Sequence, residues 1–227
     1  MTRRLLVLAG IVGLLSASAP ATATHSWGGY HWGRTANPFT LKLGDNVSGT
    51  WDAHLQTSAS DWSKSTVLDT PVVAGSTRPK PCKAVQGRVE VCSASYGWNG
   101  WLGLAQIWIS GKHIVQGVAK MNDTYFNTST YNNPAAKLHV MCQEIGHTLG
   151  LDHQAAGTAS CMNDRDRLFD AAAAHPNQHD YDQLSSIYSH TDSTSTVSAQ
   201  VSSGNGKKST KVKKGQKYIV VTYIFWA

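Results

Sequence analysis

Apolar side chains recur along the chain at spacings that predict a set of strands flanked by helices. The first helix is predicted over roughly Thr50–Ser63, where apolar residues repeat at helical intervals (Trp51, Leu55, Ala59 and Trp62). Ahead of it, Phe39–Leu43 alternates apolar and polar side chains as a half-buried strand does. Further strand-like runs follow, separated by turns that contain Gly, Pro or Asn: Val67–Val73, Arg88–Cys92, Leu102–Ile109 and His113–Met121.

A second helix has clear signals at both ends. Asn133 is a suitable N-cap, and Pro134 fits the first helical position. Its apolar stripe consists of Leu138, Met141, Ile145 and Leu149. Gly150 ends the helix, because glycine takes the left-handed conformation that lets the chain turn sharply. We expect this turn to bring His153 back towards the helix.

The last part of the chain combines a helix, a linker and a basic tail. Asp180 and Gln183 resemble a capping box, and the apolar residues Leu184, Ile187 and Tyr188 follow on one face. The Ser/Thr-rich segment Thr191–Ser203 is interpreted as a linker. After the lysine-rich segment Lys207–Lys217, the apolar run Tyr218–Trp226 is too short to span a bilayer and is predicted to be a final buried strand.

The N-terminus has the layout of a secretory signal peptide. Arg3 and Arg4 precede the apolar run Leu5–Leu15, and small residues follow up to Ala23. A membrane helix is the alternative, but the run is shorter than the ~20 apolar residues that a bilayer core requires. We predict cleavage after Ala23, or alternatively after Ala21, and a secreted mature protein without a transmembrane segment.

Charge and cysteine content refine this picture. The net charge of +6 includes Arg3, Arg4 and six lysines in Lys207–Lys217, so the rest of the chain is near −2. We therefore expect no nucleic-acid partner, while the lysine-rich tail could contact an anionic surface. Four cysteines in an exported chain predict two disulfides, with three pairings formally possible. We favour Cys82 with Cys92 and Cys142 with Cys161; a four-thiolate metal site would normally show paired CxxC spacings.

The second helix also carries a candidate metal site. Gln143 and His147 are four residues apart and therefore share one helix face, with Glu144 beside them. His153 completes a set of three ligands after the turn at Gly150. Three protein ligands and one open position form the arrangement of a catalytic zinc, because the open position holds the water that attacks the substrate.

These residues resemble the signature of the metzincin metallopeptidases, and among them the matrixin-like enzymes: H-E-x-x-H-x-x-G-x-x-H followed by a Met-turn. Glu144, His147, Gly150 and His153 match it in register, and Met162 in Ser160-Cys161-Met162 matches the Met-turn. The resemblance covers roughly Pro38–His190. It implies an α+β fold, with a twisted mixed sheet, a backing helix, an active-site helix and a small C-terminal subdomain. The corresponding division of the chain is 1–23 signal peptide, 24–190 catalytic domain and 191–227 linker and tail.

The resemblance also implies an activity. It is that of a secreted, monomeric zinc endopeptidase, in which Glu144 acts as general base on a metal-activated water. Peptide or protein substrate would bind in an extended form along an edge strand, for which His113–Met121 is the candidate. A disulfide between Cys142 and Cys161 would tie the active-site helix to the Met-turn.

Gln143 departs from the signature, which has histidine at this position. Its amide oxygen is a harder and generally weaker zinc ligand than an imidazole nitrogen. Three consequences are open: a weaker zinc site, a site for another divalent metal, or a degenerate enzyme. The alternative function is accordingly a catalytically weak or inactive secreted binding module. Retention of Glu144 favours the enzyme, because this residue has no obvious packing role.

The remaining histidines are interpreted as polar positions outside the site. His139 is eight residues from His147, roughly 12 Å along a helix at about 1.5 Å per residue, which is too far for both to bind one ion. We interpret it as a surface histidine or a partner of the ligands. Ordinary polar roles are expected for His113, His175, His179 and His190. His25 and His31 could bind metal adventitiously, but nothing in the sequence selects them.

Overall fold

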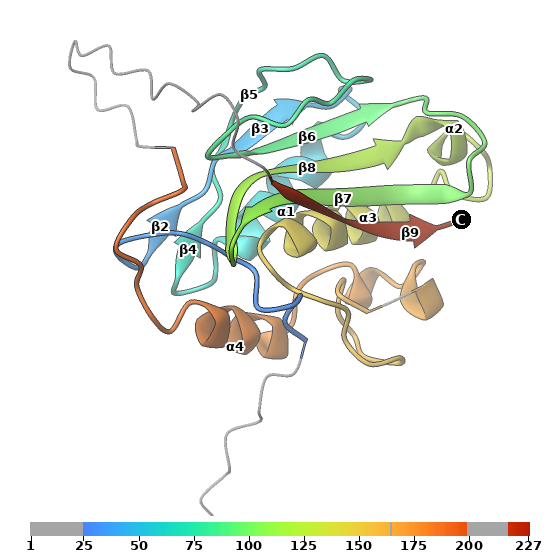
Figure 1. Cartoon of the computed structure of the whole chain (residues 1–227). Helices are drawn as coiled ribbons and strands as arrows, with labels where there is room; N and C mark the ends of the chain where they lie inside the picture. The colour runs from blue at the N-terminus through green and yellow to red at the C-terminus, as the bar shows by residue number, and fades with distance from the viewer. Residues whose placement is uncertain (1–24, 164, 199–217) are drawn as a thin grey trace, which may run out of the picture.

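A twisted mixed sheet forms one layer of the molecule, and helices α1 (Asp52–Trp62) and α3 (Pro134–Thr148) pack together on one side of it (Figure 1). This computed structural model describes residues 25–163, 165–198 and 218–227. The mixed sheet and its helices agree with the predicted α+β class. The predicted signal peptide, Asp164 and the lysine-rich segment 207–217 lie outside the described residues.

The main sheet has the strand order β5-β3-β6-β8-β7-β9, and β1 pairs with the start of β8. Its strands are β1 (His31–Trp32), β3 (Leu43–Asn46), β5 (Val72–Ala74), β6 (Val89–Ala94), β7 (Trp101–Ser110), β8 (His113–Asn122) and β9 (Ile219–Trp226). The pairs β3–β5, β3–β6, β6–β8 and β1–β8 are parallel, whereas β7 is antiparallel to both β8 and β9.

Two of the predicted strands are each divided between two sheets. Phe39–Leu43 contributes β2 (Phe39–Thr40) and then enters β3, and Val67–Val73 contributes β4 (Leu68–Asp69) and then enters β5. Strands β2 and β4 pair in parallel as a separate small sheet. The apolar pattern located both runs, but it contained no signal for the change of sheet.

The prediction that His113–Met121 is an edge strand was wrong. Strand β8 lies inside the sheet, paired along Gly117–Asn122 with β6 and along most of its length with β7. Its side chains are largely buried on both faces. A nearly continuous apolar run is typical of a strand covered on both faces, so the composition of this segment favoured a central position.

The C-terminal apolar run does form a strand, but it is not a buried one. Strand β9 adds to the outer edge of β7, with Trp108 opposite Val220 and Ala105 opposite Tyr223 (Figure 1). Ile219 and Trp226 are 63% and 57% exposed, and among the β9 residues only Phe225 is buried. An edge position with one open face explains this exposure.

Helix α3 begins and ends as its sequence predicts. The Asn133 side chain accepts hydrogen bonds from the backbone N–H groups of Ala135 and Ala136. At the other end, Gly150 has φ +99°, and a β-carbon there would collide with the carbonyl oxygen of Tyr30. Glycine is therefore required both by the backbone conformation and by a close neighbour.

The last carbonyl groups of α3 are capped by distant segments. Trp32 Nε1 donates to the carbonyl of Thr148 at 2.9 Å, and the Tyr188 hydroxyl donates to that of Leu149 at 2.8 Å. The backbone N–H of Trp27 donates to Gly150 at 2.8 Å. Helix-terminal carbonyls lack partners within the helix, so these contacts remove a desolvation cost. The N-terminal lead thus holds the end of α3.

Helix α4 (Gln178–Ile187) has a different cap from the predicted one. Asn177 is the N-cap, and Asp180 at the third helical position completes a capping box with it. The predicted pair, Asp180 with Gln183, was displaced by one helical turn. Asp180 itself is fully buried, which is unusual for an aspartate.

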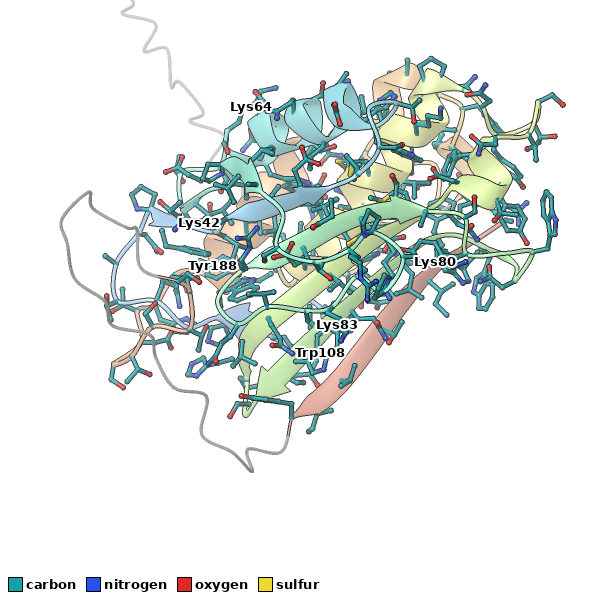
Figure 2. All side chains as sticks on the ribbon, turned by 90° about the horizontal axis from the view of Figure 1, so that it is seen from above. Lys42, Lys64, Lys80, Lys83, Trp108 and Tyr188 are labelled. Carbon is teal, nitrogen blue, oxygen red and sulfur yellow. A yellow bond between two sulfur atoms is a disulfide. The ribbon has the colours of Figure 1, made fainter. Side chains whose placement is uncertain are left out.

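The structure contains the two disulfides that the sequence favours, Cys82–Cys92 and Cys142–Cys161. The first closes a loop that packs on the sheet against Val118 and Trp108. Lys83 of this loop, Lys80 just before it and Trp108 lie over the sheet in Figure 2, whereas Lys64 follows helix α1. The second joins the middle of α3 to the segment containing Met162.

Short elements complete the described chain. They are α2 (Asp123–Phe126) and the 3-10 turns Arg165–Arg167 and Ala171–Ala173. The described part of the predicted linker contacts the domain: Thr196 hydrogen-bonds through its backbone N–H to Gly33, and Ser198 to Gly87.

Within residues 25–163, 165–198 and 218–227, no helix combines the length and apolar character needed to cross a bilayer.

Candidate metal centre

The predicted site residues meet at the C-terminal half of α3 and in the loop that follows it. Gln143, Glu144 and His147 are on the helix, with exposed fractions of 0%, 0% and 1%. His153 comes from the loop after Gly150 and is half-buried. The turn at Gly150 therefore does bring His153 back to the helix.

The two histidines face each other through their Nε2 atoms, 3.0 Å apart. His147 Nδ1 lies 2.9 Å from the carbonyl oxygen of Leu151, which accepts its hydrogen and leaves Nε2 with the lone pair. Two ligands of a tetrahedral zinc at 2.0–2.1 Å lie about 3.3–3.4 Å apart. Burial, followed by the charge of His153, holds the pKa of His147 well below its usual value, so the imidazole is neutral as a metal ligand requires.

Gln143 directs its amide nitrogen to the carbonyl oxygen of Asn163, at 2.6 Å. A carbonyl only accepts hydrogen bonds, so this contact fixes which end of the amide is nitrogen. The oxygen, Gln143 Oε1, is buried and has no hydrogen-bond partner among the described residues. A buried acceptor without a partner costs about 1–3 kcal/mol, which a cation or a bound water would relieve. The chemistry of these donors, two imidazoles and one unsatisfied amide oxygen, thus suits a divalent ion.

His139 is not at the surface, contrary to one of its two interpretations. It is fully buried, and its Nε2 lies 3.2 Å from the same Asn163 carbonyl that Gln143 contacts. It therefore adjoins the Gln143 amide.

Glu144 has no hydrogen-bond partner for either carboxyl oxygen within the described part of the chain. Burial raises its pKa well above the usual value. The carboxyl group lies against Gly103 of β7, where any β-carbon would overlap Glu144 and Val140. Glycine at this position of the strand leaves room for the acid. A cation nearby would favour the ionised form, which is the form able to accept a proton.

Met162 is fully buried and packs against Gly146, the residue before His147. The turn that carries it is fixed by Ser160, whose hydroxyl accepts from the backbone N–H of Met162 at 2.9 Å and donates to Asp180 at 2.5 Å. Asp180 also accepts from Gln154, the residue after His153, at 2.5 Å. The buried carboxylate of Asp180 thus links the turn that carries Met162 to the loop that carries His153. The sequence indicated only a capping role for Asp180 at the start of α4.

Tyr223 of β9 covers the histidine pair. Its ring stacks on that of His147 with centroids 4.3 Å apart, and the centroid of His153 lies 4.9 Å away. Its hydroxyl hydrogen-bonds to Asp152, and Trp27 packs on it at 4.4 Å. Sequence reasoning missed this residue, because a strand that follows a linker and a lysine-rich segment carried no signal for where it would pair.

A surface pocket of roughly 400 Å³ opens beside His153. It is lined by polar residues from the N-terminal lead, the loop and the start of α4: His25, His153, Gln154, Thr158, Asn177 and His179. The half-buried edge of His153 is therefore the part of the histidine pair that borders a cavity.

No family model matches the sequence, and no curated protein matches it either. Among solved structures, the chain is similar to high choriolytic enzyme 1, a hatching-enzyme zinc protease from the medaka fish Oryzias latipes. The similarity covers 70% of this chain and 94% of that one, with 12% identity and a TM-score of 0.38. A likeness of this size assigns neither fold family nor function.

Proposed function

We propose that this protein is a secreted, zinc-dependent endopeptidase of the metzincin type. The observation that carries the proposal is the convergence of the His147 and His153 Nε2 atoms at 3.0 Å, together with the carboxyl group of Glu144 on the same helix, which has no hydrogen-bond partner in the described residues. The signature around Glu144 and Gly150 supports the same reaction class. The two disulfides support an oxidising, extracytoplasmic location.

Each residue has a defined task in this proposal. His147 and His153 would hold the ion, and the oxygen of Gln143 would complete the set of protein ligands. Zinc, when bound, supplies Lewis acidity towards the scissile carbonyl and lowers the pKa of its water to about 7. Glu144 accepts the proton of the attacking water and then delivers it to the leaving amine. Met162 and the Asp180 carboxylate keep the two ligand segments in position.

Substrate access requires a change at β9. Gln143, Glu144 and His147 are at most 1% exposed, and Tyr223 lies on the histidines. Both edges of β7 are already paired, with β8 and with β9. The Glu144 carboxyl group lies against Gly103 of β7, so a peptide that pairs with the sheet at the site would have to replace β9 along β7. On this proposal the C-terminal strand lies where an extended substrate would bind.

The second candidate function is a binding module without turnover. Two observations favour it: the weak ligand Gln143 and the covered site. On this view the chain keeps the metzincin framework and binds a protein partner through its surface. The two functions differ in one measurable property, because only the enzyme requires Glu144 for a chemical step.

The test is a broad peptide-library digest by the mature protein, combined with metal analysis and a matched Glu144→Gln variant. The proposal expects one zinc at the His147–His153 site in both proteins and cleavage by the parent alone. Glutamine is close to isosteric with glutamate, so it preserves packing while removing the proton acceptor. Zinc-dependent cleavage that survives this change would remove Glu144 from the mechanism, and no cleavage with bound zinc would favour the binding module.

A further inference from the structure

A second group of metal-binding side chains lies outside the candidate catalytic site. His31 belongs to β1, while His190 and Asp192 follow helix α4. The Nε2 atoms of the two histidines are 3.2 Å apart. Asp192 Oδ1 lies 3.7 Å from the Nε2 of His31 and 3.5 Å from that of His190. His31 is 159 residues from His190 in the chain, so no local spacing indicates this group.

These three distances form a nearly regular triangle of donor atoms. For a tetrahedral zinc with ligands at 2.0–2.1 Å, neighbouring donors are separated by about 3.3–3.4 Å. The observed values of 3.2, 3.5 and 3.7 Å bracket that separation. Two imidazoles and one carboxylate are also ligands that suit zinc and similar divalent transition metals.

Neighbouring groups orient the donors of His31 and Asp192 towards the centre. His31 Nδ1 lies 3.0 Å from the carbonyl oxygen of Gly29, which accepts its hydrogen and leaves the lone pair on Nε2. Arg34 holds the other oxygen of Asp192, Oδ2, through its side chain at 2.7 Å and its backbone N–H at 3.1 Å. Oδ1 is thereby left to face the histidines. Orientation of ligands by such outer contacts is the usual arrangement around bound metals.

We propose that His31, His190 and Asp192 form a second binding site for a divalent transition metal of the zinc class. His113 Nε2 lies 3.1 Å from Asp192 Oδ1 and positions that carboxylate. The site joins β1 to the segment after α4. Both segments contribute to the cap of helix α3: β1 through Trp32, and the end of α4 through Tyr188, which is labelled in Figure 2. The bound ion therefore has a structural role: it fastens together the two segments that hold the end of the helix carrying His147.

The site is independent of the proposed catalytic function, and the experiment keeps them apart. The mature protein is stripped with a chelator, dialysed and titrated with Zn²⁺, and the tightly bound equivalents per chain are measured. Two equivalents are expected for the parent and for His175→Ala, a control histidine whose side chain pairs with Asp61 and belongs to neither group. One equivalent is expected for His147→Ala/His153→Ala and one for His190→Ala. The triple variant should bind none.

His190 is the preferred position for substitution because its side chain is 49% exposed, so its removal disturbs little packing. Circular dichroism checks that the variant is folded, and His31→Gln provides a second, conservative test. Zinc should raise the melting temperature of His147→Ala/His153→Ala, and this rise should disappear when His190→Ala is added. If the double variant binds no zinc, or His190→Ala still binds two equivalents, the contacts are a hydrogen-bond chain and the proposal is overturned.

Discussion

The ring of Tyr223 lies almost parallel to the imidazole of His147, with an angle of 20° between the planes and 4.3 Å between the centroids. These two residues are brought together by the pairing of the last strand with β7. The stack places an aromatic side chain of β9, the strand paired with β7, over a candidate metal ligand. Tyr223 is therefore the residue whose removal should most directly expose the site.

Tyr223→Ala is expected to increase peptide cleavage. A stacked aromatic pair contributes about 0.5–1.5 kcal/mol beyond its buried area, so losing it should raise the open population roughly 2- to 10-fold. The measurement is kcat/KM on a fluorogenic peptide. Val220→Ala is the matched control, because Val220 is on the same strand but 48% exposed. Equal rates for Tyr223→Ala and the parent would show that β9 is not a barrier.

Breaking the pairing of β9 should have a larger effect than removing one ring. In an antiparallel pair, adjacent residues point their N–H groups to opposite sides, so Val221→Pro combined with Thr222→Pro must remove one ladder hydrogen bond. We expect cleavage to increase and zinc removal by a chelator to become faster. The same variant should retain the circular dichroism of the parent apart from one edge strand. A slower chelator reaction than in the parent would contradict the covered site.

Gln143→His is expected to tighten zinc binding. Imidazole is a better zinc ligand than an amide oxygen, and the position is one helical turn before His147. We expect the zinc dissociation constant to fall by at least about tenfold, corresponding to about 1.4 kcal/mol. Gln143→Ala should weaken binding, since it removes the amide oxygen. A competition titration with a zinc chelator measures both, and unchanged affinity in both variants would exclude Gln143 as a ligand.

Gly150→Ala should destabilise the fold more than a similar change elsewhere. Gly150 and Gly157 have φ values of +99° and +80°, but only Gly150 has a backbone oxygen in the way of a β-carbon. Gly157→Ala should cost roughly 1–2 kcal/mol from the left-handed conformation alone. We expect Gly150→Ala to exceed this cost, as measured by urea unfolding. Equal losses would mean that Tyr30 moves aside without penalty.

Local patterns explain why the site could be predicted in part. Gln143 and His147 share a helix face at a spacing of four, and the capping signals at Asn133 and Gly150 fix both ends of that helix. These features depend on residues close in sequence. The disulfide pairing favoured by the sequence is likewise present, and its bridge at Cys142 adjoins the site.

The parts that could not be predicted depend on distant contacts. Tyr223 meets His147 only because β9 returns to the sheet, and His31 meets His190 only because β1 and the end of α4 lie together. Apolar periodicity identifies a strand but not its partner. The edge-strand prediction for β8 failed for a different reason. The apolar residues of β8 occur on both faces, which indicates a central strand, so the sequence pattern itself argued against an edge position.

The Cys142–Cys161 bridge has a practical consequence for making the protein. It joins α3, one residue before Gln143, to the turn that carries Met162, and it closes a loop of 19 residues. A bridge over a loop of this length constrains the unfolded chain by about 3 kcal/mol. Chain produced in a reducing cytoplasm lacks that constraint, so its ligands are held by packing alone. Material for metal titration should therefore come from export to an oxidising compartment or from oxidative refolding, and thiol reductants should be left out of the buffers.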